Sequence, residues 1–164
     1  MAARSEPATK TADREIVLSR VLDAPRELVF DAWTDAKHVS RWWGPRGFTT
    51  TTHEMDVRPG GAWRFVMHGP DGTDYKNRIV FLEVARPDRL VYQHSGEGEH
   101  DDVGFQATIT FADEGGKTRL TMQSLFPTAA QRDEVVQKYG AIEGGKQTLE
   151  RLAEHLGKGP AAGR

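Results

Sequence analysis

The chain contains no cysteine. This absence excludes a disulfide framework, a thiolate metal site and a cysteine nucleophile. No apolar run is long enough to span a bilayer, and the N-terminal region lacks the apolar core of a signal peptide. The net charge is only -2 and no run of basic residues occurs, which argues against nucleic acid or an anionic membrane as a partner. A cytoplasmic protein is therefore expected.

The length of 164 residues suits one domain that buries roughly 70% of the surface of its unfolded chain. Residues 1–13 and 158–164 are polar and mixed in composition, which predicts a mobile tail at each end. The domain itself is expected at residues 14–157. Which oligomeric state it adopts is left open by the sequence.

Residues 128–156 carry one apolar stripe at helical spacing, which predicts a single long helix. Thr128 is a suitable N-cap, and Gln131 three residues later completes a capping box. Gly157 and the nearby Pro160 predict the end of the helix.

The stripe of this helix has a gap at residues 143–147, where Gly144 and Gly145 replace apolar side chains. Each interior glycine costs about 1 kcal/mol relative to alanine, so a reason for the pair is needed. One interpretation is a kink, or close packing of the helix backbone onto a sheet. The other is that something other than a side chain fills the space beside the helix.

The rest of the chain alternates short apolar segments with turn residues, which predicts strands joined by short turns and therefore paired antiparallel. A sheet with one apolar face needs a cover, and the C-terminal helix carries the only large apolar stripe. An α+β fold with the sheet curved around that helix is therefore predicted. The expected strands are 15–22, 49–57, 62–68, 75–84, 90–94, 105–111 and 118–126, with short helices opened by 23–25 and spanning about 35–43.

Five motifs together resemble the bacterial homologues of the activator of heat shock protein 90 ATPase, over roughly residues 14–157. They are VFDAWTD at 29–35, WWGP at 42–45, DVRPGG at 56–61, HGPDG at 68–72 and EGGKQTL at 143–149.

This family belongs to the START-like, birch-pollen-allergen-like superfamily. The resemblance implies a helix-grip fold, in which a curved antiparallel sheet of about six to seven strands wraps a long C-terminal helix and two short helices follow the first strand. It also implies a hydrophobic cavity between sheet and helix. It does not imply one activity, because relatives include lipid and hormone carriers, polyketide cyclases and the eukaryotic co-chaperone domain.

The leading functional hypothesis is binding of a small, largely apolar or lipid-like molecule in that cavity, without a cofactor or metal. Pockets of this kind are lined by aromatic and aliphatic side chains with a few polar groups. The candidate ligand-binding residues are Trp43, Trp63, Phe65, Met67, Tyr75, Phe81, Tyr92, His94, Phe105, Met122, Tyr139 and Glu143.

Several of these residues have a second interpretation. The tryptophans suit core packing as well as an aromatic wall. Since Trp42 and Trp43 are adjacent, they cannot share one helical face, so one is expected in the core and the other half-exposed or at a cavity mouth. His94 is either a hydrogen-bonded core side chain or a general acid or base in the cavity. Glu143 is either a ligand anchor, or paired with a strand arginine such as Arg78, or in solvent at the edge.

Two other classes of function stay open. One is a co-chaperone-like protein that acts on a heat shock protein 90 ATPase. The other is a cavity enzyme of the polyketide cyclase or dehydratase type, although no nucleophile triad can be assembled from the serines. The acidic run around His100, with Asp101 and Asp102, suits a solvated loop better than a cation site. Asp56 and Arg58 are expected to form a local pair that holds the glycine turn after them.

Overall fold

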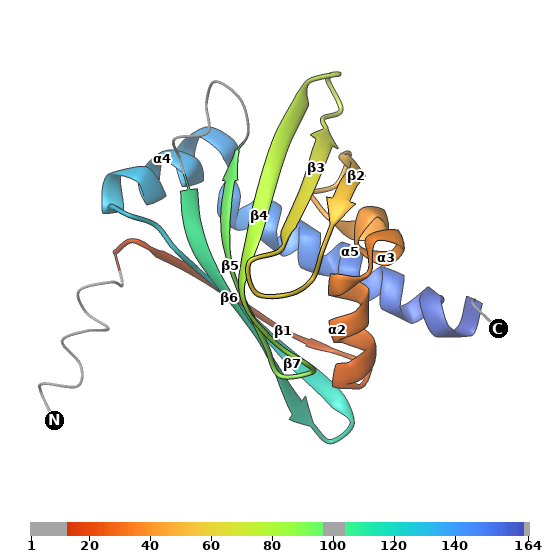
Figure 1. The fold of residues 1–164 in the computed structure, drawn as a ribbon. Coiled ribbons are helices and arrows are strands. Elements are labelled where there is room, and N and C mark those ends of the chain that lie inside the picture. Colours follow the sequence, from red (N-terminus) through yellow and green to blue (C-terminus); the bar gives the residue numbers. More distant parts are fainter. Residues whose placement is uncertain (1–12, 97–103, 163–164) are drawn as a thin grey trace, which may run out of the picture.

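The protein is described here by a computed structural model for residues 13–96 and 104–162. Seven strands form one curved antiparallel sheet, and four helices accompany it within these residues (Figure 1). The predicted α+β helix-grip fold is confirmed. The strands are β1 (Glu15–Leu22), β2 (Thr49–Met55), β3 (Ala62–His68), β4 (Asp74–Ala85), β5 (Arg89–Gly96), β6 (Gly104–Glu114) and β7 (Lys117–Leu125), and the helices are α2 (Arg26–Thr34), α3 (Ala36–Trp42), α4 (Ala129–Tyr139) and α5 (Ala141–Ala162).

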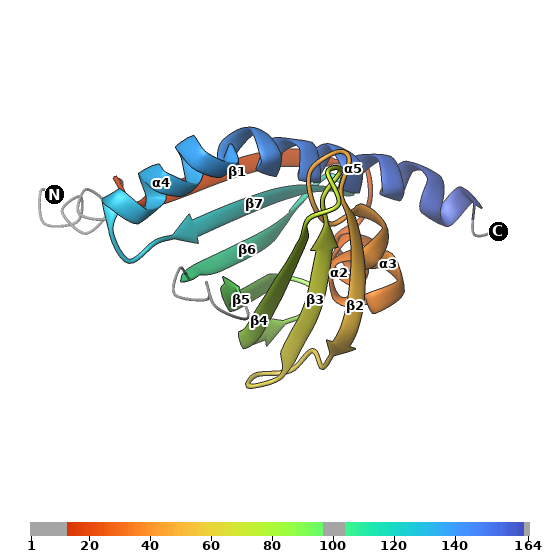
Figure 2. The same cartoon turned by 90° about the horizontal axis from the view of Figure 1, so that it is seen from above.

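The strand order is β1-β7-β6-β5-β4-β3-β2. Strands β2 to β6 each pair with the next strand along the chain, as the short turns predict, while β1 pairs with β7. Helix α5 packs against β1 at one edge of the sheet and against α2 and α3. It therefore runs along the concave side of the sheet (Figure 2).

The predicted single C-terminal helix is wrong in one respect, because the structure divides it into α4 and α5. Gly140 separates them in the left-handed conformation, with φ 61° and ψ 44°, and its N–H donates to the carbonyl of Val136 at 3.1 Å. Glycine adopts this conformation without the steric cost that a side chain brings. The predicted N-cap is confirmed, since Thr128 accepts a hydrogen bond from the N–H of Gln131 at 3.1 Å.

The end of the last helix also differs from the prediction. Helix α5 continues past Gly157 and Pro160 to Ala162. Gly157 keeps helical backbone geometry, whereas Gly140 has a positive φ. A glycine ends a helix through the left-handed conformation, and composition alone does not say which glycine adopts it. No helix of the described residues has both the length and the apolar character needed to cross a membrane.

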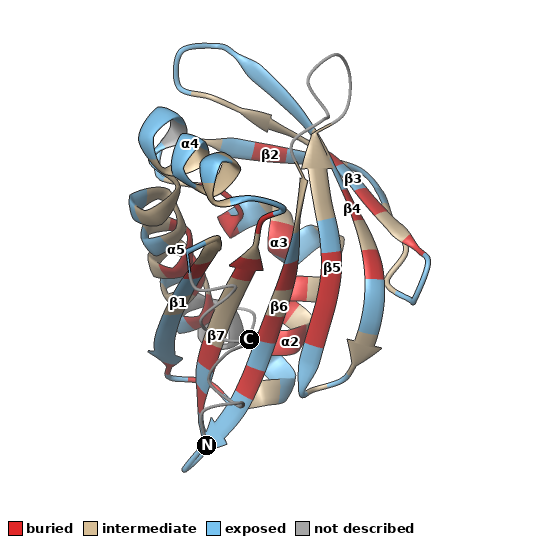
Figure 3. Cartoon of the chain, turned by 90° about the vertical axis from the view of Figure 1, so that its left-hand side faces the viewer, coloured by how far each residue is buried: buried red, intermediate tan, exposed pale blue. Residues whose placement is uncertain are grey.

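The core lies on the concave side, between the central strands and helices α2, α3 and α5 (Figure 3). Helix α2 contributes the apolar face that the sequence predicts, with Val29, Phe30 and Trp33 all buried. At the β2–β3 turn the predicted local pair is confirmed, because Arg58 Nε lies 2.7 Å from Asp56 Oδ2.

Candidate functional site

The register of strands β3 to β6 places several of the predicted wall residues on one face of the sheet. His94 of β5 lies opposite Ile79 of β4 and also opposite Phe105 of β6. Tyr92 lies opposite Phe81 in the same way. Directly paired residues share a face, as do residues two apart along a strand. These side chains therefore point to the same, concave, side.

On this face of strand β6, burial decreases from Phe111 toward Phe105. Phe111, at one end, is 1% exposed and contacts Phe30 and Trp33 of α2, with ring centroids 5.2 and 6.1 Å away. Phe105, six residues earlier and on the same face, is only partly buried. The partly buried side chains of the concave face include Leu18, Met67, His94, Phe105 and Met122, a set called here the inner-face patch.

His94 is the polar residue of the inner-face patch. Its Nε2 lies 3.0 Å from Oδ1 of Asn77 on the neighbouring strand. Its ring otherwise meets aromatic rings, with the centroid of Phe105 at 4.9 Å, that of Phe65 at 5.9 Å and that of Trp43 at 6.4 Å. The interpretation as a hydrogen-bonded histidine within the core region is thus the one that the contacts support.

Burial alters the ionisation of two neighbouring side chains. Desolvation lowers the pKa of His94 to about 4, because the surrounding protein disfavours the imidazolium. It raises the pKa of Tyr92, against the opposing effect of a hydrogen bond with Trp33. Both side chains are therefore uncharged at neutral pH.

The alternative that one of the adjacent tryptophans is half-exposed is wrong, because Trp42 is 0% and Trp43 7% exposed, while the alternative of a cavity mouth stays a prediction. Trp42 is the last residue of α3 and donates from Nε1 to the carbonyl of Ala32 at 3.0 Å. Trp43 already has an extended backbone, with φ -68° and ψ 131°, so the spacing rule for one helical face does not apply to it. Its ring packs on Trp63 and Phe65, with centroids 4.9 and 5.9 Å away.

Three other predicted residues lie at the edge of this region or beyond it. Tyr75 is 40% exposed and packs against Phe48. Glu143 is exposed in the first turn of α5, which matches the solvent alternative, and Arg78 is exposed on β4. No ion pair of Glu143 occurs within the described residues. Tyr139 ends α4, and its side chain is not among those described.

The two glycines of α5 are explained by close packing. A Cβ on Gly145 would stand 2.5 Å from Cδ1 of Leu18 on β1. A Cβ on Gly144 would stand 3.3 Å from Cγ of Pro45. The alternative, that something other than a side chain occupies this space, is wrong for both positions.

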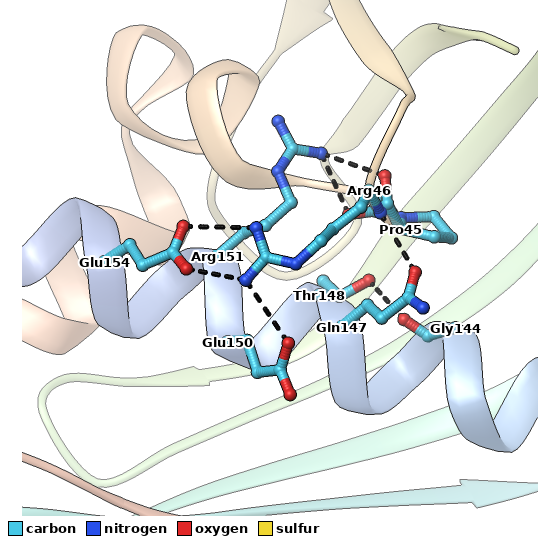
Figure 4. Close-up of polar contacts among 9 residues, drawn as sticks. Pro45, Arg46, Gly144, Gln147, Thr148, Glu150, Arg151 and Glu154 are labelled. Atoms are coloured by element: carbon cyan, nitrogen blue, oxygen red, sulfur yellow. Dashed lines mark hydrogen bonds and ion pairs between the residues drawn. The ribbon is translucent and has the colours of Figure 1, made fainter. Parts of the chain in front are cut away.

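Arg151 of α5 is a residue that sequence reasoning missed. It holds the α3–β2 loop, residues 43–48, against the helix (Figure 4). Its Nη1 lies 2.9 Å from the carbonyl oxygen of Gly44 and 3.1 Å from that of Phe48, and its Nη2 lies 3.1 Å from that of Arg41. Burial lowers the pKa of Arg151, and the positive charge of Arg46 lowers it further. No local pattern could reveal this role, because Gly44 is 107 positions away in the chain.

A second arginine joins the same loop to the exposed side of α5. Arg46 Nη2 lies 2.6 Å from Glu154 Oε2 and 3.2 Å from Glu150 Oε1, and these hydrogen bonds raise the pKa of Arg46 (Figure 4). Its backbone N–H donates to Gln147 Oε1 at 3.1 Å. The loop that contains Trp43 is thus bound to α5 by two arginines, Arg151 from the helix and Arg46 from the loop itself.

Two further histidine arrangements lie away from the inner-face patch. His68 joins β2 and β4, with Nε2 2.8 Å from Thr51 Oγ1 and Nδ1 2.8 Å from Asp74 Oδ1. His38 Nδ1 lies 2.9 Å from His155 Nε2 between α3 and α5. Among the described residues no three His, Asp or Glu side chains form a group that could hold a metal ion. The acidic run at residues 100–102 lies outside the described residues.

Solved structures with the same architecture come from several bacteria. A crystal structure from Nitrosomonas europaea is 27% identical with a TM-score of 0.81, over 92% of this chain and 98% of that one. A solution structure from Arthrobacter aurescens is 24% identical with a TM-score of 0.84, over 92% and 90%. A crystal structure from Mycobacterium smegmatis is 23% identical with a TM-score of 0.81, over 89% and 92%. The last two show the fold alone.

No curated protein gives a significant match to the chain. The family described as "Activator of Hsp90 ATPase homolog 1-like protein" matches residues 23–157, which include every described helix and strand except β1 and the end of α5. The similarity thus covers strands β2 to β7 of the sheet, the α3–β2 loop and the glycine pair of α5. The chain therefore belongs to the family of activator of Hsp90 ATPase homolog 1-like proteins.

Proposed function

We propose that the protein binds a small, largely apolar molecule between the concave face of its sheet and helix α5. The observation that carries this proposal is the loss of burial along one face of one strand. Phe111 is 1% exposed beneath α2, while Phe105 on the same face retains accessible surface. Accessible apolar surface on a concave face is the usual setting of a ligand site.

The surroundings of His94 support the same proposal. Four aromatic rings lie around its imidazole, and this burial lowers its pKa to about 4. The side chain nevertheless keeps part of its surface accessible. Both properties together suit a side chain that lines a narrow recess, and they do not suit one on an open convex surface.

The residues of this region have different proposed roles. Leu18, Met67, His94, Phe105 and Met122 of the inner-face patch are proposed to touch the ligand, with Tyr75 at the rim. Five nearly fully buried side chains are proposed to pack against the patch and fix the positions of its residues: Trp43, Trp63, Phe65, Phe81 and Tyr92. The rings in contact with His94 carry no charge at neutral pH, which favours a neutral ligand.

Titration with the apolar fluorescent probe N-phenyl-1-naphthylamine tests the site. We expect saturable binding by the wild type in the micromolar range. Met122→Trp should fill part of the recess and weaken binding by roughly tenfold, the effect of losing about 1.4 kcal/mol. Gln123→Trp is the matched control, because this neighbouring residue of β7 points to the opposite face.

Three results of the titration would count against the proposal. They are no saturable binding by a folded wild type, equal weakening by both variants, and unchanged binding by Met122→Trp. Circular dichroism on both variants would show that each keeps the fold. If Met122→Trp does not fold, competition between the probe and 2-methoxynaphthalene on the wild type replaces it, and additive rather than competitive binding would reject a single site.

The family description names a chaperone ATPase, which gives the alternative of a co-chaperone-like role. A docking surface for it would need clustered exposed anchors. The large apolar side chains that are exposed among the described residues are spread over β1, α2 and β4: Val17, Val21, Leu28, Tyr75 and Leu82. We therefore expect no several-fold change in the ATPase rate of the cognate chaperone, and such a change would favour the alternative.

A further inference from the structure

The hydrogen bonds of Asn77 define which nitrogen of His94 carries the hydrogen. Asn77 Nδ2 donates to the backbone carbonyl of Tyr75 at 2.9 Å, which identifies this end of the amide as the NH2 group. The amide oxygen, Oδ1, therefore faces His94 Nε2 at 3.0 Å. Because an amide oxygen only accepts hydrogen bonds, Nε2 must be the protonated nitrogen. In the neutral ring Nδ1 is then an unprotonated acceptor.

Nδ1 of His94 has no hydrogen-bond partner among the described residues. Every fully buried side-chain nitrogen or oxygen in that part of the chain does have one. Nδ1 must therefore keep some accessible surface. Around it stand the rings of Phe105, Phe65 and Trp43. Water can donate to this acceptor in the unliganded protein, whereas a bound apolar ligand without a donor would leave it unsatisfied. A ligand that supplies the donor therefore gains affinity relative to one that does not.

The ring remains an acceptor at neutral pH, since burial lowers the pKa of His94 to about 4. Tyr92 is the titratable side chain among its aromatic neighbours, and its pKa is raised, so it stays a neutral phenol. Among the described residues the hydrogen-bond partner of the ring is the uncharged Asn77, and burial alone accounts for the lowered pKa, without a contribution from a charged side chain. A carboxylate ligand would present lone pairs to a lone pair and would find no cation to balance its charge.

From these contacts we propose that the ligand is a neutral molecule with an apolar body and one hydroxyl or N–H group, and that this group donates a hydrogen bond to Nδ1 of His94. The inference rests on the proposed function, since it names the class of molecule that the same site accepts. Phenols, alcohols and uncharged N-heterocycles with an N–H belong to this class. Hydrocarbons, ethers and carboxylates of the same size do not.

Two naphthalenes of similar shape separate the classes. 2-Naphthol has a hydroxyl donor, whereas 2-methoxynaphthalene has the same ring system without a donor. Calorimetric titration at pH 7 gives the ratio of their affinities. We expect His94→Phe to lower the naphthol-to-ether ratio roughly three- to tenfold relative to the wild type, the range for one hydrogen bond. His68→Phe is the matched control, because His68 pairs with Thr51 and Asp74 away from the patch, and it should leave the ratio unchanged.

Spectroscopy on the wild type keeps the proposal testable if His94→Phe fails to fold. With 15N-labelled histidine, the Nδ1 resonance of His94 should have the chemical shift of an unprotonated nitrogen. It should move toward the hydrogen-bonded value with 2-naphthol and not with 2-methoxynaphthalene. A protonated Nδ1 in the unliganded protein, or equal responses to both compounds, would overturn the proposal.

The outcomes also separate this inference from the proposed function. If both naphthalenes bind and the ratio is the same in the wild type and His94→Phe, the donor requirement is wrong and the apolar site stands. If neither compound binds the folded wild type, the apolar site and the donor requirement are both rejected.

Discussion

Gly145 of α5 lies against Leu18 of β1 so closely that a Cβ on the glycine would stand 2.5 Å from the Leu18 Cδ1 atom. The contact brings the last helix onto the first strand, at the edge of the sheet where α5 begins its course along the concave side. Here the helix backbone itself is the packing surface. The stability lost by placing glycine in a helix is offset by this close approach.

Gly145→Leu is expected to destabilise the protein by roughly 1–3 kcal/mol, because the new side chain must displace Leu18. Chemical denaturation measures the change. Gly157→Ala is the control within the same helix, since no atom lies within 4 Å of its Cβ position, and it should stabilise by up to about 1 kcal/mol. Adding Leu18→Ala to Gly145→Leu should recover part of the loss, and strict additivity of the two changes would argue against the contact.

Gly140→Ala tests the division between α4 and α5. With φ at 61°, an alanine at this position should cost roughly 1–2 kcal/mol. In one continuous helix the same substitution would instead stabilise by about 1 kcal/mol. The sign of the change in the free energy of unfolding therefore decides between a divided and a continuous helix.

Arg151→Met is expected to lower the free energy of unfolding by roughly 2–3 kcal/mol, because several loop carbonyls lose their charged donor. Arg46→Met is the companion variant on the same loop. Its ion pairs with Glu150 and Glu154 are about half exposed, so it should cost less than about 1 kcal/mol and the cost should shrink in high salt. Similar losses for the two variants would reject the special role of Arg151.

His94 should make the protein less stable in mild acid. The unfolded chain takes up the histidine proton below a pKa of about 6.5, whereas the folded protein takes it up only near pH 4. As the pH falls between these values the unfolded state binds more protons, so the free energy of unfolding decreases, by at most about 3 kcal/mol. Denaturation curves of wild type and His94→Gln from pH 7 to pH 4 measure the effect. The variant should lose less stability, and parallel losses would contradict the shifted pKa.

The order of the elements was predictable because each strand is local in sequence and has clear turn residues at its ends. The division at Gly140 could not be predicted, because the apolar stripe continues across it. Such a stripe indicates which face of a helix is apolar, and it does not indicate the backbone dihedral angles of one glycine. Helical spacing does not describe Trp43, because α3 ends one residue before it. Both differences lie at a residue where an element ends.

The candidate site was predictable only as a set of residues on one face. Alternation along β5 and β6 indicates that His94 and Phe105 share a side with Tyr92, and the register of the strands agrees with it. Their unequal burial could not be predicted, since it depends on where α2 covers the sheet. Nor could the exposure of Glu143, because the sequence does not show that a new helix begins at Ala141 and places Glu143 in its first turn.

The pairing of β1 with β7 has a consequence for how the chain folds. Strands β2 to β7 can form in succession, because each finds its partner across a short connection. Glu15 pairs with Leu125, so β1 must wait until nearly the whole sheet has been synthesised and then close a long loop. Helix α5 needs β1 in place before it can dock through Gly145. Of the seven strands of this sheet, the one synthesised first is thus expected to be among the last to be ordered, and until then its apolar face stays exposed to non-native contacts.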